Sequence, residues 1–199
     1  GDMSNTGIEV VLNADIVRTK NFVWSANANI TWVQNKVLRL PDSSKDRVID
    51  GHAGFINGST FIAEGLPLGS LYIHEWAGVN PDTGEGMWWK YDTKTNPETE
   101  ELEGEWIKTS DYQNKMSGDV DSRKLMGCTQ PKFFGGFGTT VYAYGFDFSV
   151  AFDYQLGGKT IDGTYASYMS SPYTNSLGEN YHLDLLNAWT PENKNSDIP

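Results

Sequence analysis

The stretch that decides the fold is Asn21–Val33, NFVWSANANITWV, in which two kinds of residue alternate without a break. Side chains of an extended strand point alternately to opposite faces. One face therefore carries Trp24, Ala26, Ala28, Ile30 and Trp32, and the other carries Ser25, Asn27, Asn29 and Thr31. The pattern predicts a strand that separates an apolar environment from an aqueous one.

A second stretch, Phe146–Leu156, repeats the pattern with an apolar face that is mostly aromatic. Its apolar residues are Phe146, Phe148, Val150, Phe152, Tyr154 and Leu156, which alternate with Asp147, Ser149, Ala151, Asp153 and Gln155. A soluble sandwich would bury this face in its core, whereas a membrane barrel would turn it toward acyl chains. Periodicity alone leaves both possibilities open.

Composition favours strands and loops over helices. The chain has 199 residues, enough for one domain with a core, and it combines 13% aromatic residues with 21 glycines. The predicted class is all-β with antiparallel strands. The formal net charge of −11 disfavours nucleic acid as a partner, because both would be negative. The single cysteine, Cys128, excludes an internal disulfide.

Turn signals divide the chain into four segments, which alternate between hairpins and longer connections. They are a hairpin over 7–35, a long loop over 36–130, a hairpin over 134–156 and a final loop over 157–199. The first strand covers Gly7–Val17, and the second is expected to end at Asn35. Both hairpin turns, Arg18–Asn21 and Tyr144–Gly145, are short. In outer-membrane barrels short turns are periplasmic and long loops extracellular, so the two long segments are expected on the outer side.

The two long segments are expected to hold little regular structure. Residues 36–130 should be mainly loop with short strands, and Leu71–Trp76 could pair with Gly86–Tyr91 as a small hairpin outside the main sheet. In the last segment, Glu179–Ala188 is predicted as one short helix, which Pro191 would stop.

Several blocks of the chain resemble a known family in the same order. The runs are NTGIEVVLNADIVRTKNFVWSANANITWVQNKVLRL, EGLPLGSLYIHEWAGVNPDTGEGMWWKYD, QPKFFGGFGTTVYAYGFDFSVAFDYQLGG and NAWTPENKNSDIP. The most specific motifs are Gly65-x-Pro67-x-Gly69-Ser70, Gly78-Val79-Asn80-Pro81-x-Thr83-Gly84 and Trp189-Thr190-Pro191-x-Asn193. Together they look like the C-terminal part of SusC/RagA-type TonB-dependent transporters.

The resemblance implies a large transmembrane β-barrel in the cell outer membrane, closed by an N-terminal plug. Such proteins import glycans or other nutrients such as peptides with energy from TonB, and a SusD-like surface lipoprotein forms their lid. This chain resembles about four strands of a barrel of roughly 22. It is therefore expected to be a fragment that cannot transport anything alone.

An excised set of strands would have two unpaired edges and an apolar face without lipid. We expect the 36–130 segment to cover that face, or copies of the fragment to self-associate into a sandwich-like or oligomeric arrangement. The alternative is a stand-alone extracellular β-sandwich that binds carbohydrate. That alternative predicts that the aromatic strand is buried within one copy.

The candidate site residues point to binding rather than to catalysis. His52, His74 and His182 do not lie at metal-ligand spacing from one another or from Cys128, so no metal cofactor is expected. No Gly-x-Ser-x-Gly elbow and no Gly-rich phosphate loop after a strand occurs, so no enzyme is expected. Flat aromatic rings in an outer loop suit sugar stacking or peptide contacts, which makes Trp88, Trp89, Tyr91 and Trp106 candidates. The candidate lumen-facing residues are Asn27, Asn29, Asp147 and Asp153. Calcium binding by the loops is left open.

Overall fold

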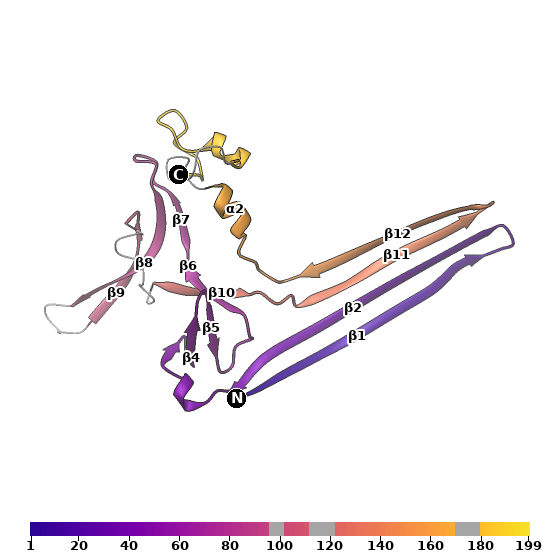
Figure 1. Ribbon diagram of the computed structural model, residues 1–199, viewed down its shortest axis with the longest axis horizontal. Helices are drawn as coiled ribbons and strands as arrows, with labels where there is room; N and C mark the ends of the chain where they lie inside the picture. The colour runs from indigo at the N-terminus through magenta and orange to yellow at the C-terminus, as the bar shows by residue number, and fades with distance from the viewer. Residues whose placement is uncertain (96–101, 112–121, 170–179) are drawn as a thin grey trace. The chain divides into compact units, whose positions relative to one another are not determined.

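The computed structural model describes residues 1–95, 102–111, 122–169 and 180–199, and most of them form strands (Figure 1). The all-β class is thereby confirmed. No helix in these described ranges is long and apolar enough to cross a membrane. The chain divides into two compact units. The first comprises Gly1–Leu71 and Gly127–Thr160, and the second comprises Tyr72–Met126 and Ile161–Pro199.

The first unit contains a four-stranded antiparallel sheet of long strands. Its members are β1 (Asp2–Arg18), β2 (Phe22–Arg39), β11 (Phe133–Ala143) and β12 (Phe146–Leu156), in the order β1-β2-β11-β12. The β11–β12 turn is tight because Tyr144 and Gly145 both have positive φ, 50° and 93°, as a two-residue hairpin turn requires.

The register of β2 against β11 aligns the two hairpins (Figure 1). Phe137 lies opposite Ala28 on one side and Phe152 on the other. Both turns lie at the same end of the sheet, since Phe22 pairs with Ala143 and the Tyr144 amide donates to the Asn21 carbonyl over 3.0 Å. The amphipathic patterns of the strands therefore coincide on common faces.

Directly paired residues of antiparallel strands share a face, so the register defines two faces of this sheet. The apolar face carries Ile8, Val10, Leu12, Ala14, Trp24, Ala26, Ala28, Ile30, Trp32, Phe133, Phe137, Val141, Phe146, Phe148, Val150, Phe152, Tyr154 and Leu156. The polar face carries Glu9, Asn13, Asp15, Ser25, Asn27, Asn29, Thr31, Thr140, Asp147, Ser149, Asp153 and Gln155.

The apolar face is largely exposed. Phe146 is 80% exposed, Phe148 62% and Phe152 53%. Within the first unit, residues 36–71 therefore do not cover this face, contrary to what we expected for that part of the 36–130 segment. The first unit also does not bury the aromatic strand in a core of its own.

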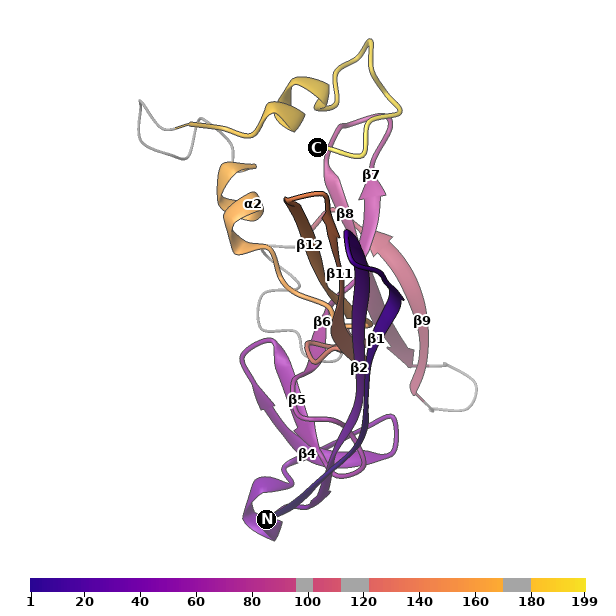
Figure 2. The same ribbon diagram turned by 90° about the vertical axis from the view of Figure 1, so that its right-hand side faces the viewer.

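The expectation that residues 36–130 form mainly loop is also wrong, because short strands occupy much of this segment (Figure 2). In the first unit these are β3 (Arg47–Ile49), β4 (His52–Asn57) and β5 (Thr60–Ala63), after the 3-10 helix η1 (Asp42–Ser44). They pair as an antiparallel sheet, and β5 meets Leu71, in β6 (Ser70–His74), through Thr60. Phe61 and Ala63 are fully buried in this small sheet.

The loop over residues 65–69 is joined to the far end of β2. Val37 donates to the Leu66 carbonyl over 2.9 Å, and the Gly65 amide donates to the Val37 carbonyl over 2.8 Å. The side chain of Asn35 accepts from the Leu68 amide over 2.7 Å and donates to the Asn5 side chain over 2.6 Å. Asn35 is thus buried within β2, and the expectation that it ends the strand is wrong.

The second unit contains another small sheet, of strands β7 (Trp76–Val79), β8 (Gly86–Thr95) and β9 (Leu102–Thr109) in that order. Strand β6 is not in this sheet and lies between β10 (Arg123–Cys128) and β5 in its own sheet. The expected pairing of Leu71–Trp76 with Gly86–Tyr91 is therefore only partly right: β8 pairs with Trp76–Val79, and β6 belongs to a different sheet.

The helix expected over Glu179–Ala188 is wrong in type and length. The described part of that range holds only the 3-10 helix η2 (Leu183–Asn187). A short α-helix, α2 (Gly163–Tyr168), lies earlier, where the Asp162 side chain caps it by accepting from the Tyr165 amide over 2.8 Å.

Candidate functional site

Three of the four predicted lumen-facing residues lie close together on the polar face, and the fourth does not. Asn29 pairs with Gly136 of β11, which pairs in turn with Asp153 of β12. Asn27 precedes Asn29 by two residues in β2, on the same face, and pairs with Gly138. Asp147 instead pairs with Tyr142 near the hairpin turn.

The glycines of β11 make room for these polar side chains. A Cβ added at Gly136 would lie 2.9 Å from the Asp153 Oδ1 atom, and one at Gly138 would lie 3.3 Å from the Asn27 Oδ1 atom. Asn29 accepts a hydrogen bond from the Gly136 amide over 3.1 Å. Side chains from β2 and β12 therefore lean over the backbone of β11.

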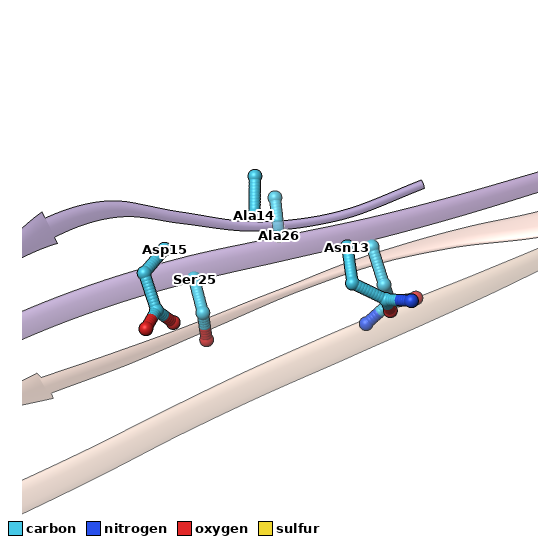
Figure 3. Close-up of a pocket in the computed structure, with 6 residues that line it drawn as sticks. Asn13, Ala14, Asp15, Ser25 and Ala26 are labelled. Carbon is cyan, nitrogen blue, oxygen red and sulfur yellow. The ribbon is translucent and has the colours of Figure 1, made fainter. Parts of the chain in front are cut away.

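A hollow of about 310 Å³ lies next to these residues, between β1 and β2. Figure 3 shows Asn13, Asp15 and Ser25 pointing to one side of the strands, while Ala14 and Ala26 point to the other. Asn27 completes the lining. Sequence reasoning placed Ser25 on the wet face of β2 but overlooked Asn13 and Asp15 as site residues, although the same alternation in β1 could have identified them.

The acidic group in this hollow is already paired. The Arg18 guanidinium donates from Nη2 and Nε to the Asp15 Oδ2 atom, over 2.6 and 3.1 Å. Both side chains are exposed, so this ion pair contributes little to stability.

Three polar side chains on the apolar face, those of Trp24, Thr139 and Tyr154, bond within the sheet. The Trp24 indole donates to the Thr139 hydroxyl over 2.8 Å, and this hydroxyl donates to the Ser25 carbonyl over 3.0 Å. The Tyr154 hydroxyl donates to the Asn29 carbonyl over 3.1 Å. These bonds satisfy the polar groups without water, as an apolar solvent would require.

The second unit separates the predicted aromatic binding residues onto two faces of one sheet. Tyr91 of β8 pairs with Trp106 of β9, with ring centroids 5.3 Å apart, and Trp89 shares their face. Trp88 lies on the opposite face, where its ring meets that of Trp76 edge to face at 5.0 Å. The four residues therefore do not form one platform.

Lysine side chains lie over the rings of the first group. The Lys124 Nζ atom is 4.1 Å from the centroid of the Trp106 ring and 5.6 Å from that of Trp89. The Lys108 Nζ atom is 5.1 Å from the Trp89 centroid, and Lys124 also forms an ion pair with Glu75. These lysines occupy ring faces that a sugar would need for stacking. Sequence reasoning missed them because they come from other strand positions.

A polar cluster joins α2 to η2. The Tyr165 hydroxyl donates to the Asp184 carboxylate over 2.8 Å, and this hydrogen bond raises the pKa of Tyr165 above its usual value of 10.0. The His182 ring lies 4.8 Å from that of Tyr165. All three side chains are partly exposed, and the described residues contain no cluster of three or more candidate metal ligands.

Two of the sequence motifs meet in the second unit. The Trp189 indole donates to the Pro81 carbonyl over 3.1 Å. Its ring also lies over Gly84, where an added Cβ would come within 2.4 Å of a ring carbon. Gly84 has a φ of 77°, so both its backbone conformation and its contact with Trp189 favour glycine.

No family model matches the sequence, but individual proteins are similar over its whole length. TonB-dependent receptor P3 of Formosa agariphila is 30% identical over all of this chain, and TonB-dependent receptor P26 of the same organism is 26% identical. The chain spans 19% of the length of each of these relatives.

Solved structures of the RagAB peptide transporter contain the same fold. One matches 99% of the chain with a TM-score of 0.71 and 24% identity, and the closed-closed state of the RagAB peptide importer matches with a TM-score of 0.69 and 25% identity. The chain covers 20% of each of those chains. The blocks and motifs quoted above, the sheet and these similarities agree: the chain belongs to the SusC/RagA-type TonB-dependent receptors.

Proposed function

We propose that this chain forms part of the barrel wall of an outer-membrane importer that TonB energises. In this arrangement the apolar face of the four-stranded sheet contacts lipid, and the polar face lines the interior. The full-length protein would be a transporter rather than an enzyme, with a SusD-like lipoprotein at the cell surface. The chain alone would not transport.

The observation that carries the proposal is the exposed apolar face, on which Trp24, Thr139 and Tyr154 bond internally. In water this face would cost free energy roughly in proportion to its area, and these three side chains would not need internal acceptors. In hydrocarbon both features are favourable. The exposure of Phe146 and Phe148 also argues against the sandwich alternative.

The spacing of aromatic residues fits a bilayer. Trp24 and Trp32 are eight residues apart in β2, or about 27 Å along the strand. At a strand tilt of about 40° this spans about 21 Å across the membrane, near the roughly 25 Å of apolar surface between aromatic girdles. The turns Arg18–Asn21 and Tyr144–Gly145 would then lie at the periplasmic side, and residues 36–130 and 157–199 outside.

The substrate would be a glycan or a peptide, as for importers of this type. The solved relatives are described as peptide transporters, which makes peptides a candidate here. A second proposed substrate contact is Tyr91, which is 36% exposed. Trp106 is 39% exposed and would contribute only the part of its ring that Lys124 leaves open. Trp88 and Trp89 are less accessible, so their contribution would be smaller.

Paired cysteines test the orientation of the sheet. In a Cys128→Ser background, Leu12→Cys and Asn13→Cys place an environment-sensitive fluorophore at adjacent positions on opposite faces. With the protein expressed from its full gene and held in bilayers, we expect lipid-borne quenchers to act only at position 12 and aqueous quenchers only at position 13. Equal quenching by the aqueous reagent at both positions would contradict the proposal.

A further inference from the structure

We infer that the lipid-facing side of the four-stranded sheet binds the phosphate-bearing headgroup of an outer-leaflet lipid through Lys36, just beyond the last apolar row of the sheet. This inference rests on the proposed function, which turns the apolar face toward lipid and places residues 36–130 outside the cell. Three observations carry it: the row in which the apolar face ends, the polar residues that follow on the same face, and a local excess of positive charge.

The apolar face ends in one row that crosses all four strands. Ile8 of β1 pairs with Trp32 of β2. Trp32 also pairs with Phe133 of β11, which pairs in turn with Leu156 of β12. Aromatic rings such as those of Trp32 and Phe133 suit the level of a membrane–water interface. The row therefore marks where the lipid headgroups would begin.

Beyond this row the same face becomes polar. Gln34 and Lys36 follow Trp32 at every second residue of β2, and their partners in β1 are Thr6 and Ser4. Lys36 lies four residues beyond Trp32, which is about 14 Å along the strand and about 10 Å along the membrane normal at a tilt of about 40°. The headgroup layer extends about 5–8 Å beyond the hydrocarbon. The flexible stem of Lys36 can bend back over this difference and place the ammonium among the phosphates.

Segments of this chain lie on both sides of β2 at this level. Strand β1 pairs with one side of β2, and the loop over residues 65–69 bonds to the other side at Val37. The Thr129 amide in turn donates to the Gly69 carbonyl over 3.0 Å. Lys36 thus lies within a continuous wall and not at an edge of it. The neighbours that the argument uses all belong to the first unit.

Positive charge is in excess along this wall, although the chain as a whole carries a formal charge of −11. The only charged side chains are those of Lys36, Arg39, Lys159 and Asp2, and Arg39 already pairs with Asp2 over 3.1 Å. Within the described ranges, neither Lys36 nor Lys159 forms an ion pair. A phosphate is the anion that suits such an ammonium group at a membrane surface. The segments counted here, the outer rim, are residues 2–6, 34–39, 65–69, 127–131 and 157–159.

The surroundings of Lys36 fit a lipid better than a free anion. Thr6 and Gln34, which lie between Lys36 and the apolar row, are exposed and can bond ester or sugar oxygens of a headgroup. Ile8 and Leu156 in that row are 64% and 56% exposed and can contact acyl chains. A free phosphate would use only the ammonium, and a single exposed ion pair contributes little. A phosphorylated lipid uses all three layers.

The test uses the protein expressed from its full gene and held in neutral detergent. A fluorophore at Thr6→Cys, in a Cys128→Ser background, reports binding beside Lys36. The probes are synthetic lipid A with two phosphates and the same lipid with none, which differ only in their charged groups. We expect the phosphorylated lipid to bind about fivefold more tightly, or better, because each lysine near a charged lipid surface contributes a factor of about this size.

Variants of two lysines localise the effect. Lys36→Gln should lower the affinity for the phosphorylated lipid about fivefold and leave that for the other lipid unchanged, whereas Lys36→Arg should keep the preference. Lys132→Gln is the matched control, because it removes an ammonium next to Phe133 of the same row but on the opposite face of the sheet. It should change neither affinity. Heat-modifiable migration on gels checks that each variant is folded.

Three results would overturn the inference. They are equal binding of the two lipids, equal losses for Lys36→Gln and Lys132→Gln, and displacement of the phosphorylated lipid by inorganic phosphate alone, since the site would then recognise an anion and not a lipid. Failure here is distinguishable from failure of the proposed function. If the fluorophores at Leu12 and Asn13 report lipid and water as expected while the one at Thr6 shows no preference for phosphates, only the headgroup site is wrong.

Discussion

Phenylalanine occurs in two opposite settings in the first unit. Phe61 of β5 is fully buried in a small sheet, whereas Phe146 and Phe148 of β12 are 80% and 62% exposed. The first setting is what water imposes on an aromatic side chain. The second setting is favourable where another apolar phase replaces water. One chain thus combines a core packed as in water-soluble proteins with a face that, by our proposal, contacts lipid.

The core should be the more sensitive region. Phe61→Ala removes a fully buried ring and should lower the free energy of unfolding by about 3–5 kcal/mol. The measurement is denaturant unfolding of the protein in detergent micelles. Phe148→Ala, which changes a side chain that only detergent would contact, serves as the comparison. A cost for Phe148→Ala equal to that for Phe61→Ala would remove the distinction between the two settings.

A charged side chain on the proposed lipid-facing side of β12 should destabilise the protein. Phe152→Lys places an ammonium group on the apolar face near mid-strand and should cost about 2–4 kcal/mol in a bilayer. Ala151→Lys, the neighbouring position on the polar face, should cost almost nothing. Folding yield into lipid vesicles measures both. Similar losses for the two lysine variants would show that the faces are not distinct.

The buried side chain of Asn35 helps to join β2 to the loop before β6. Asn35→Ala would leave the Leu68 amide without its acceptor and the Asn5 side chain without its donor. We expect a loss of about 2 kcal/mol, because a buried polar group left unsatisfied costs more than a typical net hydrogen bond. Hydrogen exchange of the Leu68 amide should also rise, whereas Gln34→Ala, the exposed neighbour, should leave it unchanged.

The smallest expected effect concerns pH. The Glu64 carboxylate accepts hydrogen bonds from the Lys45 ammonium and from the Leu40 amide. Both lower its pKa below the usual 4.5, and Lys45 has the larger effect. Because the folded pKa is the lower one, this contribution to stability is complete above about 4.5 and is lost as pH falls through the folded pKa. The pKa of Lys45 is raised by the same pair, so its contribution is lost only when pH rises through that folded pKa.

A single variant isolates this contribution. The difference in unfolding free energy between the native protein and Glu64→Gln should shrink as the pH falls from neutrality to about 3. Glu9→Gln, on the exposed polar face, is the control for general charge effects. A difference that stays constant over this range would mean that the carboxylate of Glu64 does not stabilise the loop near η1.

The four-stranded sheet could be predicted because the alternation of apolar and polar residues extends over long stretches of sequence. Each of β2 and β12 repeats the two-residue alternation over many residues, and the short turns allow only antiparallel pairing. The strands between Lys36 and Gln130 are mostly three to six residues long, too short for periodicity to stand out. The β4–β5 hairpin, for example, joins strands of only six and four residues.

The candidate sites show the same limit. Alternation placed Asn27, Asn29 and Asp153 on wet faces, but only the register of β11 brings them together and separates Asp147. Trp89 lies in the aromatic run Trp88–Tyr91 and Trp106 lies further along the chain, so both rings could be named from the sequence. The lysines that lie over them depend on pairings between strands. Local patterns thus predict which face a residue occupies, and register decides which residues meet.

The most direct test of the account is an accessibility scan along β12. Single nitroxide labels at each position from Phe146 to Leu156, in a Cys128→Ser background and with the full-length protein in bilayers, report collisions with oxygen and with a water-soluble nickel complex. The account predicts a two-residue period, with oxygen maxima at even positions such as Phe148 and Phe152 and nickel maxima at odd ones such as Asp153. Even positions shielded from both reagents would reveal a protein core instead of lipid, and would contradict the account.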